Sequence, residues 1–180
     1  EDIFLTHSKE YYKKLVSQSL SAKEIRPIGF PMSELLIERE KKIAQGTIEC
    51  TDFSLENGVS MNIAGGTHHA FRDRAEGFCL LNDQAIAANY LLYKGLAKKI
   101  LIIDLDVHQG NGTASIFDNN KNVYTLSFHG KKNYPFKKEK SDLDVEFDDE
   151  TDDSEYLKKL ENIIPNLIHN LKPDFIFYLS

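Results

Sequence analysis

The sequence has 180 residues, 41% of them hydrophobic, and a formal net charge of −6. This length and apolar content suit one globular domain with a buried core. The acidic balance argues against a nucleic-acid or anionic-membrane surface, since either needs a basic face. No apolar run approaches the roughly 18 residues that span a bilayer, the N-terminus lacks the features of a signal peptide, and two cysteines are too few for a disulfide framework. The composition predicts a soluble, cytoplasmic protein.

The spacing of apolar residues predicts that helices alternate with strands along the chain. Asp152 followed by Glu155 resembles a capping box at the start of the last helix, and Pro165 is expected to kink that helix. The alternation favours a three-layer α/β fold, a parallel sheet with flanking helices. In chain order, the predicted elements are helix 8–20, helix 32–45 ended by Gly46, strand 59–64, helix 82–97, strand 100–103, strand 123–128, strand 142–148, helix 153–171 and strand 175–179.

The last predicted strand, 175–179, is followed only by Ser180. Functional groups in open α/β sheets lie just beyond the carboxyl ends of strands. We therefore expect residues 1–180 to form a single domain that is a truncated piece of a larger catalytic unit. Between residues 141 and 155 there are nine acidic residues and no basic one, a pattern that predicts a solvated face rather than a binding site.

The most informative segment is Asp104-Leu105-Asp106-Val107-His108, directly after the apolar strand 100–103. In an extended chain, side chains at alternate positions point the same way. Asp104, Asp106 and His108 are therefore expected to converge at the carboxyl end of this strand. Carboxylates there are costly to desolvate unless a cation or hydrogen-bonding partner offsets the cost. A carboxylate oxygen and an imidazole nitrogen suit zinc and similar divalent ions.

A second candidate is the tandem pair His68-His69, which follows Gly65-Gly66. Paired glycines let the backbone approach a neighbour closely, so both histidines can line one cavity. Each imidazole needs a partner on its second nitrogen to fix its tautomer. Asp104 is an available carboxylate for one histidine, and Asn111 an available amide for the other.

Two further interpretations of these residues compete with a metal-dependent hydrolase. A haloacid-dehalogenase-type phosphatase also places Asp-x-Asp after an apolar strand, with Asp104 as nucleophile, Asp106 as acid/base and magnesium as the ion. His108 and the histidine pair count against it. The second alternative is a non-catalytic binding domain.

Cys79 is expected to be a buried structural thiol rather than a nucleophile.

Four motifs, in their order and spacing, resemble the zinc-dependent histone deacetylase family across residues 60–180. The Gln-Gly-Asn-Gly form of the third is most similar to the class IV branch and its bacterial relatives. The motifs are Gly65-Gly66-Thr67-His68-His69-Ala70, Glu76-Gly77-Phe78-Cys79, Asp104-Leu105-Asp106-Val107-His108-Gln109-Gly110-Asn111-Gly112 and Thr125-Leu126-Ser127-Phe128-His129.

The resemblance implies an arginase/deacetylase fold and hydrolysis of the amide of acetyl-lysine, acyl-lysine or a related acylated amine. It implies a catalytic zinc, for which iron or cobalt can substitute, held by Asp106 and His108. The third ligand, an Asp, and the family's transition-state Tyr are expected beyond residue 180. His69 is implied as the general base and acid, and His68 as its electrostatic support.

The resemblance assigns further roles around these residues. Asp104 stands behind His68, and Asn111 stands where many members have Asp behind His69, an exchange that is expected to lower the pKa of His69. Thr67 and Phe136 depart from the family's pattern at the tunnel rim. A structural potassium is implied at Asp104, Ser127 and Phe128 together with backbone oxygens of Asp106 and His108, and the acyl-lysine tunnel is implied at Gly77, Phe78 and Tyr134.

Overall fold

The computed structural model describes residues 1–180 and contains one sheet of four strands in the order β3-β2-β1-β4. Every neighbouring pair is parallel, so the predicted α/β class is confirmed. β1 lies inside the sheet, and its first four residues are fully buried as the unbroken apolar run predicted. The strands are β1 (Ile100–Asp104), β2 (Val123–Gly130), β3 (Leu143–Phe147) and β4 (Phe175–Leu179).

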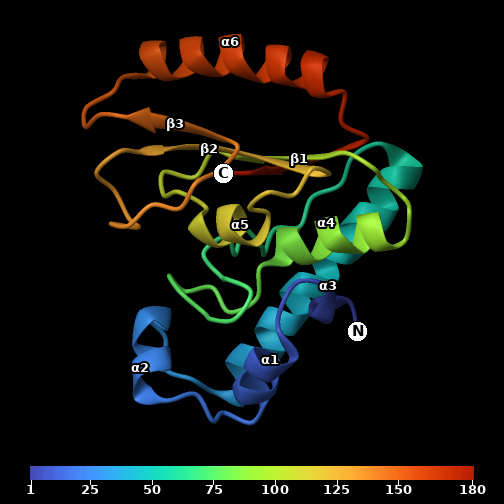
Figure 1. Cartoon of the computed structure of the whole chain (residues 1–180), viewed down its shortest axis with the longest axis vertical. Coiled ribbons are helices and arrows are strands. Elements are labelled where there is room, and N and C mark those ends of the chain that lie inside the picture. The colour runs from blue at the N-terminus through green and yellow to red at the C-terminus, as the bar shows by residue number, and fades with distance from the viewer.

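Helices cover both faces of the sheet (Figure 1). α6 lies across one face, over the cluster formed by Leu101 and Ile103 with β2 and β3. Ile100 and Ile102 point to the opposite face and join the larger core with α1, α3 and α4. None of the helices is both long and apolar enough to cross a bilayer. The helices are η1 (Asp2–Leu5), α1 (Lys9–Val16), α2 (Ala22–Ile25), η2 (Arg26–Ile28), α3 (Glu34–Asn57), α4 (Asp83–Tyr93), α5 (Asn111–Ile116) and α6 (Asp153–Leu171).

The predicted helix starts at 82 and 152 are confirmed by their caps. Asn82 accepts a hydrogen bond from the Ala85 N–H at 3.0 Å, and Asp152 accepts one from the Glu155 N–H at 2.9 Å. The carboxylate of Glu155 pairs with Lys159 rather than returning to the cap, so only half of the predicted capping box forms. α4 ends before Ala97 because the chain adopts a left-handed turn at Gly95, with φ +69°.

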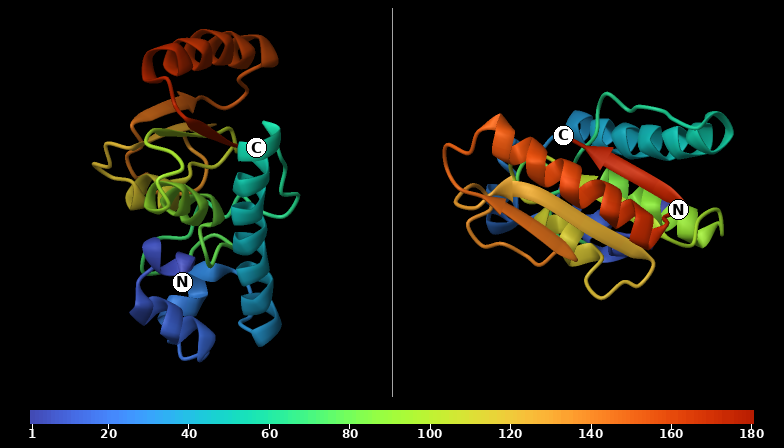
Figure 2. Two further views of the ribbon diagram at one scale, coloured as in Figure 1. Left: turned by 90° about the vertical axis from the view of Figure 1, so that its right-hand side faces the viewer. Right: turned by 90° about the horizontal axis from the view of Figure 1, so that it is seen from above.

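Two predictions about the segment between residues 46 and 64 are wrong. Gly46 does not end its helix: α3 continues to Asn57, and the missing side chain at 46 gives room to Asn62, whose amide donates to the Ile43 carbonyl at 3.1 Å. Residues 59–64 form no strand, because no other strand pairs with them. Side chains such as Ile63, 95% exposed, point into solvent. Figure 2 shows α3 as one long helix at the side of the molecule.

Within the acidic segment 141–155, predicted as a solvated face, Asp142 is exposed and Asp144 half-buried, and both carboxylates also make hydrogen bonds. Asp142 accepts hydrogen bonds from the N–H and hydroxyl of Thr125 at 2.8 and 3.0 Å. Asp144 accepts from the Gln109 amide at 2.8 Å and the Ser141 N–H at 2.9 Å. These two carboxylates tie the entry of β3 to β2 and to the loop after β1.

A buried histidine connects the N-terminus to the cap of α4. The His7 side chain lies in the core, and its Nε2 accepts a hydrogen bond from the Asn82 N–H at 2.9 Å. Burial lowers the pKa of His7 to about 4, since the charged ring loses its hydration there.

We expect acidification from pH 7 to pH 5 to destabilise the protein through His7. Between the ordinary pKa of 6.5 and the lowered pKa of about 4, only the unfolded chain takes up the proton. The free energy of unfolding is therefore about 2 kcal/mol lower at pH 5 than at pH 7. The His7→Gln variant keeps an acceptor for Asn82 but cannot titrate. Urea unfolding at both pH values should show a smaller loss in the variant; an equal loss in both proteins would contradict this role.

Candidate functional site

The candidate site lies at the carboxyl end of β1, where the sheet opens toward the loops. Asp104 is the last residue of β1 and stands in register between Ser127 of β2 and Leu179 of β4. Beyond it the chain is no longer extended: the Asp104 carboxylate accepts from the Asp106 N–H at 3.0 Å, and Asp106 accepts from the His108 N–H at 2.7 Å. The extended alternation assumed for these residues therefore stops at Asp104: its side chain is buried, whereas Asp106 and His108 lie together, partly exposed, at the same end of β1.

His68 and Asp104 form a buried pair. His68 Nδ1 lies 2.6 Å from Asp104 Oδ2, and the two side chains are only 5% and 4% exposed. Burial alone lowers the pKa of His68, but the adjacent carboxylate of Asp104 outweighs it, so the pKa is raised. The pair requires glycine at position 110, since a Cβ there would overlap the Asp104 carboxylate.

His69 forms the second pair, with the side-chain amide of Asn111. Its Nδ1 lies 2.7 Å from Asn111 Oδ1, which also accepts from the Gly112 N–H at 3.0 Å. A backbone N–H can only donate, so the amide oxygen faces this way and His69 carries its proton on Nδ1. Burial, together with the neighbouring His68, lowers the pKa of His69 to about 4. The ring is therefore neutral at pH 7, with Nε2 available to accept a proton.

A buried carboxylate on α4 holds the loop that carries both histidines. Asp83 Oδ1 accepts from the N–H and the hydroxyl of Thr67 at 2.9 and 2.6 Å. Asp83 Oδ2 accepts from the Thr47 hydroxyl at 2.7 Å. Sequence analysis placed residue 83 only within the predicted helix 82–97 and missed this role. The available signal was an acidic residue opening an otherwise apolar helix.

Asp106 and His108 form a pair of metal-type donors at the surface of the site. His108 Nδ1 lies 3.0 Å from Asp106 Oδ1, and the side chains are 39% and 31% exposed. Their carboxylate oxygen and imidazole nitrogen fit zinc and similar ions. These residues supply two donors, and no cluster of three or more His, Cys, Asp or Glu side chains is placed to hold an ion.

Aromatic rings border the histidines. The ring of Tyr134 stands edge-on to His69, with 4.9 Å between ring centroids. Gly77, at φ +54°, allows both rings to approach its backbone. Phe78 is exposed and packs on Phe30 with centroids 4.9 Å apart, because the Phe78 N–H donates to the Ile28 carbonyl at 2.8 Å. Sequence analysis missed Phe30, since the contact depends on a loop far from the motifs.

The residues assigned to potassium lie beside the first pair. Ser127 is buried next to Asp104 on the adjacent strand, and its hydroxyl lies 2.9 Å from His129 Nδ1. The side chain of Phe128 packs in the core beneath α6, so only its backbone oxygen remains as a donor.

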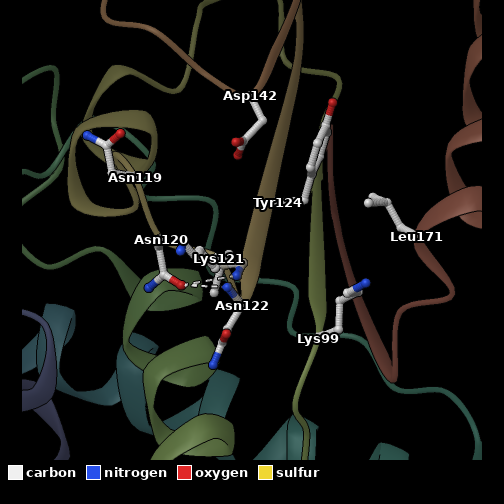
Figure 3. A pocket seen from close by; sticks show the side chains of 9 residues that line it. Lys99, Asn119, Asn120, Lys121, Asn122, Tyr124, Asp142 and Leu171 are labelled. Atoms are coloured by element: carbon white, nitrogen blue, oxygen red, sulfur yellow. Dashed lines mark hydrogen bonds between the residues drawn. The ribbon is translucent and has the colours of Figure 1, made fainter.

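A separate hollow lies at the opposite, amino-terminal edge of the sheet (Figure 3). Its rim is organised by Asn120, whose side-chain oxygen accepts from the Asn122 N–H at 2.9 Å. Sites in parallel α/β sheets form at the other edge, and this hollow contains none of the paired histidines. Its lining residues are Lys99, Asn119, Asn120, Lys121, Asn122, Val123, Tyr124, Asp142 and Leu171.

The parallel sheet and the paired histidines at its carboxyl edge define a protein of the arginase/deacetylase fold class. The sequence profile of the histone deacetylase domain matches residues 1–180. The chain therefore belongs to the histone deacetylase family. The magnesium phosphatase alternative finds no support.

Individual relatives agree with this assignment. An uncharacterized protein of Picosynechococcus is 43% identical over 174 residues, 97% of this chain and 58% of its own. Histone deacetylase 2 of Arabidopsis thaliana is 30% identical over 187 residues, 98% of this chain and 48% of its own. The crystal structure of a histone deacetylase homologue from Aquifex aeolicus has a TM-score of 0.85 at 27% identity, covering 98% of this chain and 53% of that one. The chain thus spans about half the length of these relatives.

We expect ¹⁵N NMR of the histidine-labelled protein at pH 7 to show His69 neutral, with its proton on Nδ1. The reason is its lowered pKa of about 4 and the Asn111 oxygen that accepts from that nitrogen. The His69→Ala variant assigns the signal. A positively charged ring, or a proton on Nε2, would contradict the geometry of this pair.

Proposed function

We propose that this chain is part of a metal-dependent deacylase that hydrolyses the amide of acetyl-lysine, acyl-lysine or a related acylated amine. The observation that carries the proposal is the arrangement of His68 and His69, each held by a polar partner at Nδ1, beside the donor pair of Asp106 and His108. Membership of the histone deacetylase family supports the same reaction.

Zinc is the proposed metal, with iron and cobalt as ions that the same donors accept. Asp106 and His108 would hold it, and a third ligand Asp and a transition-state Tyr would come from sequence following β4 in a protein with the whole domain. When bound, the metal polarises the amide carbonyl and lowers the pKa of a water molecule toward neutrality. A structural potassium at Asp104, Ser127 and the Phe128 carbonyl is proposed alongside.

The histidines of this chain then have distinct roles. His69 Nε2 takes a proton from the attacking water and gives it to the leaving amine. His68, held by Asp104, provides electrostatic support without exchanging that proton. Gly77, Phe78 and Tyr134 form the walls that hold the acyl-lysine stem.

The two free cysteines are consistent with a cytoplasmic location.

A second candidate is a deacetylase-like binding domain without activity. It is favoured by one observation: residues 1–180 bring together two metal donors, fewer than the three protein ligands of a catalytic zinc site. The two candidates differ in whether any acylated substrate is turned over.

The test is hydrolysis of a panel of acyl-lysine peptides, acetyl through long-chain, by a protein that includes the whole domain. We expect turnover that falls by about 10²-fold or more in His69→Ala, the scale of general acid–base catalysis. Asp106→Ala should abolish it. Ser115→Ala, an exposed position on α5, is the matched control and should retain it. No turnover of any peptide by the metal-loaded wild type would favour the binding domain instead.

A further inference from the structure

A second carboxylate, that of Glu76, lies behind His69 on the far side of the Asn111 side chain. The Asn111 side-chain nitrogen donates to Glu76 Oε1 at 2.8 Å, and the Tyr134 hydroxyl donates to the same oxygen at 2.9 Å. The other oxygen of Glu76 faces the half-exposed Arg74 at 3.7 Å. Glu76 therefore has one oxygen directed into the site and one directed outward.

The hydrogen bonds in this group all run in one direction. His69 Nδ1 donates to the Asn111 oxygen, and the Asn111 nitrogen donates to Glu76. A carboxylate has no hydrogen to donate, so Glu76 accepts from both the Asn111 amide and the Tyr134 hydroxyl and fixes which end of the amide faces it. Aligned hydrogen bonds polarise one another, so the charge of Glu76 is felt at His69 through the amide.

Backbone hydrogen bonds and partial burial hold Glu76 in place. Glu76 pairs through its backbone with Cys79, in both directions, at 3.1 and 3.0 Å, and its side chain is 20% exposed. Tyr134, held by Glu76, stands edge-on to His69. The carboxylate thus orients both neighbours of His69: the amide behind it and the ring beside it.

We propose that Glu76 is a positioning residue for His69, supplying through the Asn111 amide the negative charge that a neutral amide alone lacks. As His69 takes up a proton from the attacking water, this charge compensates the imidazolium that forms. The inference rests on the proposed function of His69 as acid and base.

The test exchanges the two side-chain types. Glu76→Gln removes the charge but keeps the shape and the hydrogen-bonding capacity. Asn111→Asp places a carboxylate directly against that of Glu76, where a bond of 2.8 Å exists now, and like charges at that distance repel. The double variant Glu76→Gln/Asn111→Asp restores one amide and one carboxylate, with their order reversed.

In a protein that includes the whole domain, we expect Glu76→Gln to lower kcat about tenfold with little change in KM, a fraction of what acid–base catalysis contributes. Asn111→Asp should also lower kcat, and the double variant should recover most of the loss. The matched control is Asp73→Asn on the same loop, whose side chain is 70% exposed; it should leave kcat unchanged. An unchanged kcat in Glu76→Gln, or losses that multiply in the double variant, would overturn the proposal.

The same four proteins provide a readout that needs no activity. At pH 7 the urea midpoint of unfolding should fall in Asn111→Asp, because two carboxylates then face each other. It should recover in the double variant, where a carboxylate again faces an amide. Additive destabilisation would overturn the pairing. If the wild type hydrolyses no acyl-lysine peptide, the proposed function fails by itself, and this stability cycle still decides whether Glu76 and Asn111 are coupled.

Discussion

The burial of the Asp104 carboxylate at the end of an inner strand is the constraint on which the rest of this site depends. β1 is apolar up to that residue, so the strand delivers a carboxylate into a region from which water is excluded. A buried carboxylate without a partner costs several kcal/mol. His68 offsets the cost at a distance of 2.6 Å, and the glycine at position 110 leaves room for that contact.

Several features far apart in the sequence follow from this one contact. The loop carrying His68 must cross over the end of β1, and Asp83 of α4 holds it there through Thr67. The chain after β1 must leave space for the same pair, which is why residue 110 has no side chain. The start of α5 then places Asn111 behind His69. One electrostatic requirement thus brings three separate segments to one edge of the sheet.

The sequence predicted the parts of this structure that depend on local patterns. Strand β1 was predicted from its unbroken run of apolar residues, and helix α6 from apolar residues spaced to form a stripe on one side of a helix. The partners of His68 and His69 were anticipated because Asp104 ends an apolar strand and Asn111 follows it closely, at the edge of the sheet where sites form. Glu76 and Phe30 were missed, since their roles come from contacts between loops and leave no periodic signal. The false strand at 59–64 had the alternation of a strand but no neighbour with which to pair.

The site combines groups that differ in burial. The histidine pairs are buried and oriented within the chain, whereas Asp106 and His108 are partly exposed and lie beside them. This division suits the proposed function, in which the buried histidines act as acid–base groups and Asp106 and His108 hold the metal.

Metal content is the most direct test of that arrangement. A protein that includes the whole domain, purified and measured by elemental analysis, should hold one zinc, iron or cobalt ion per chain. The His108→Ala variant should lose it, while Ser115→Ala retains it. An unchanged metal content in His108→Ala, or no bound metal in the wild type after incubation with zinc, would contradict a metal site at the end of β1.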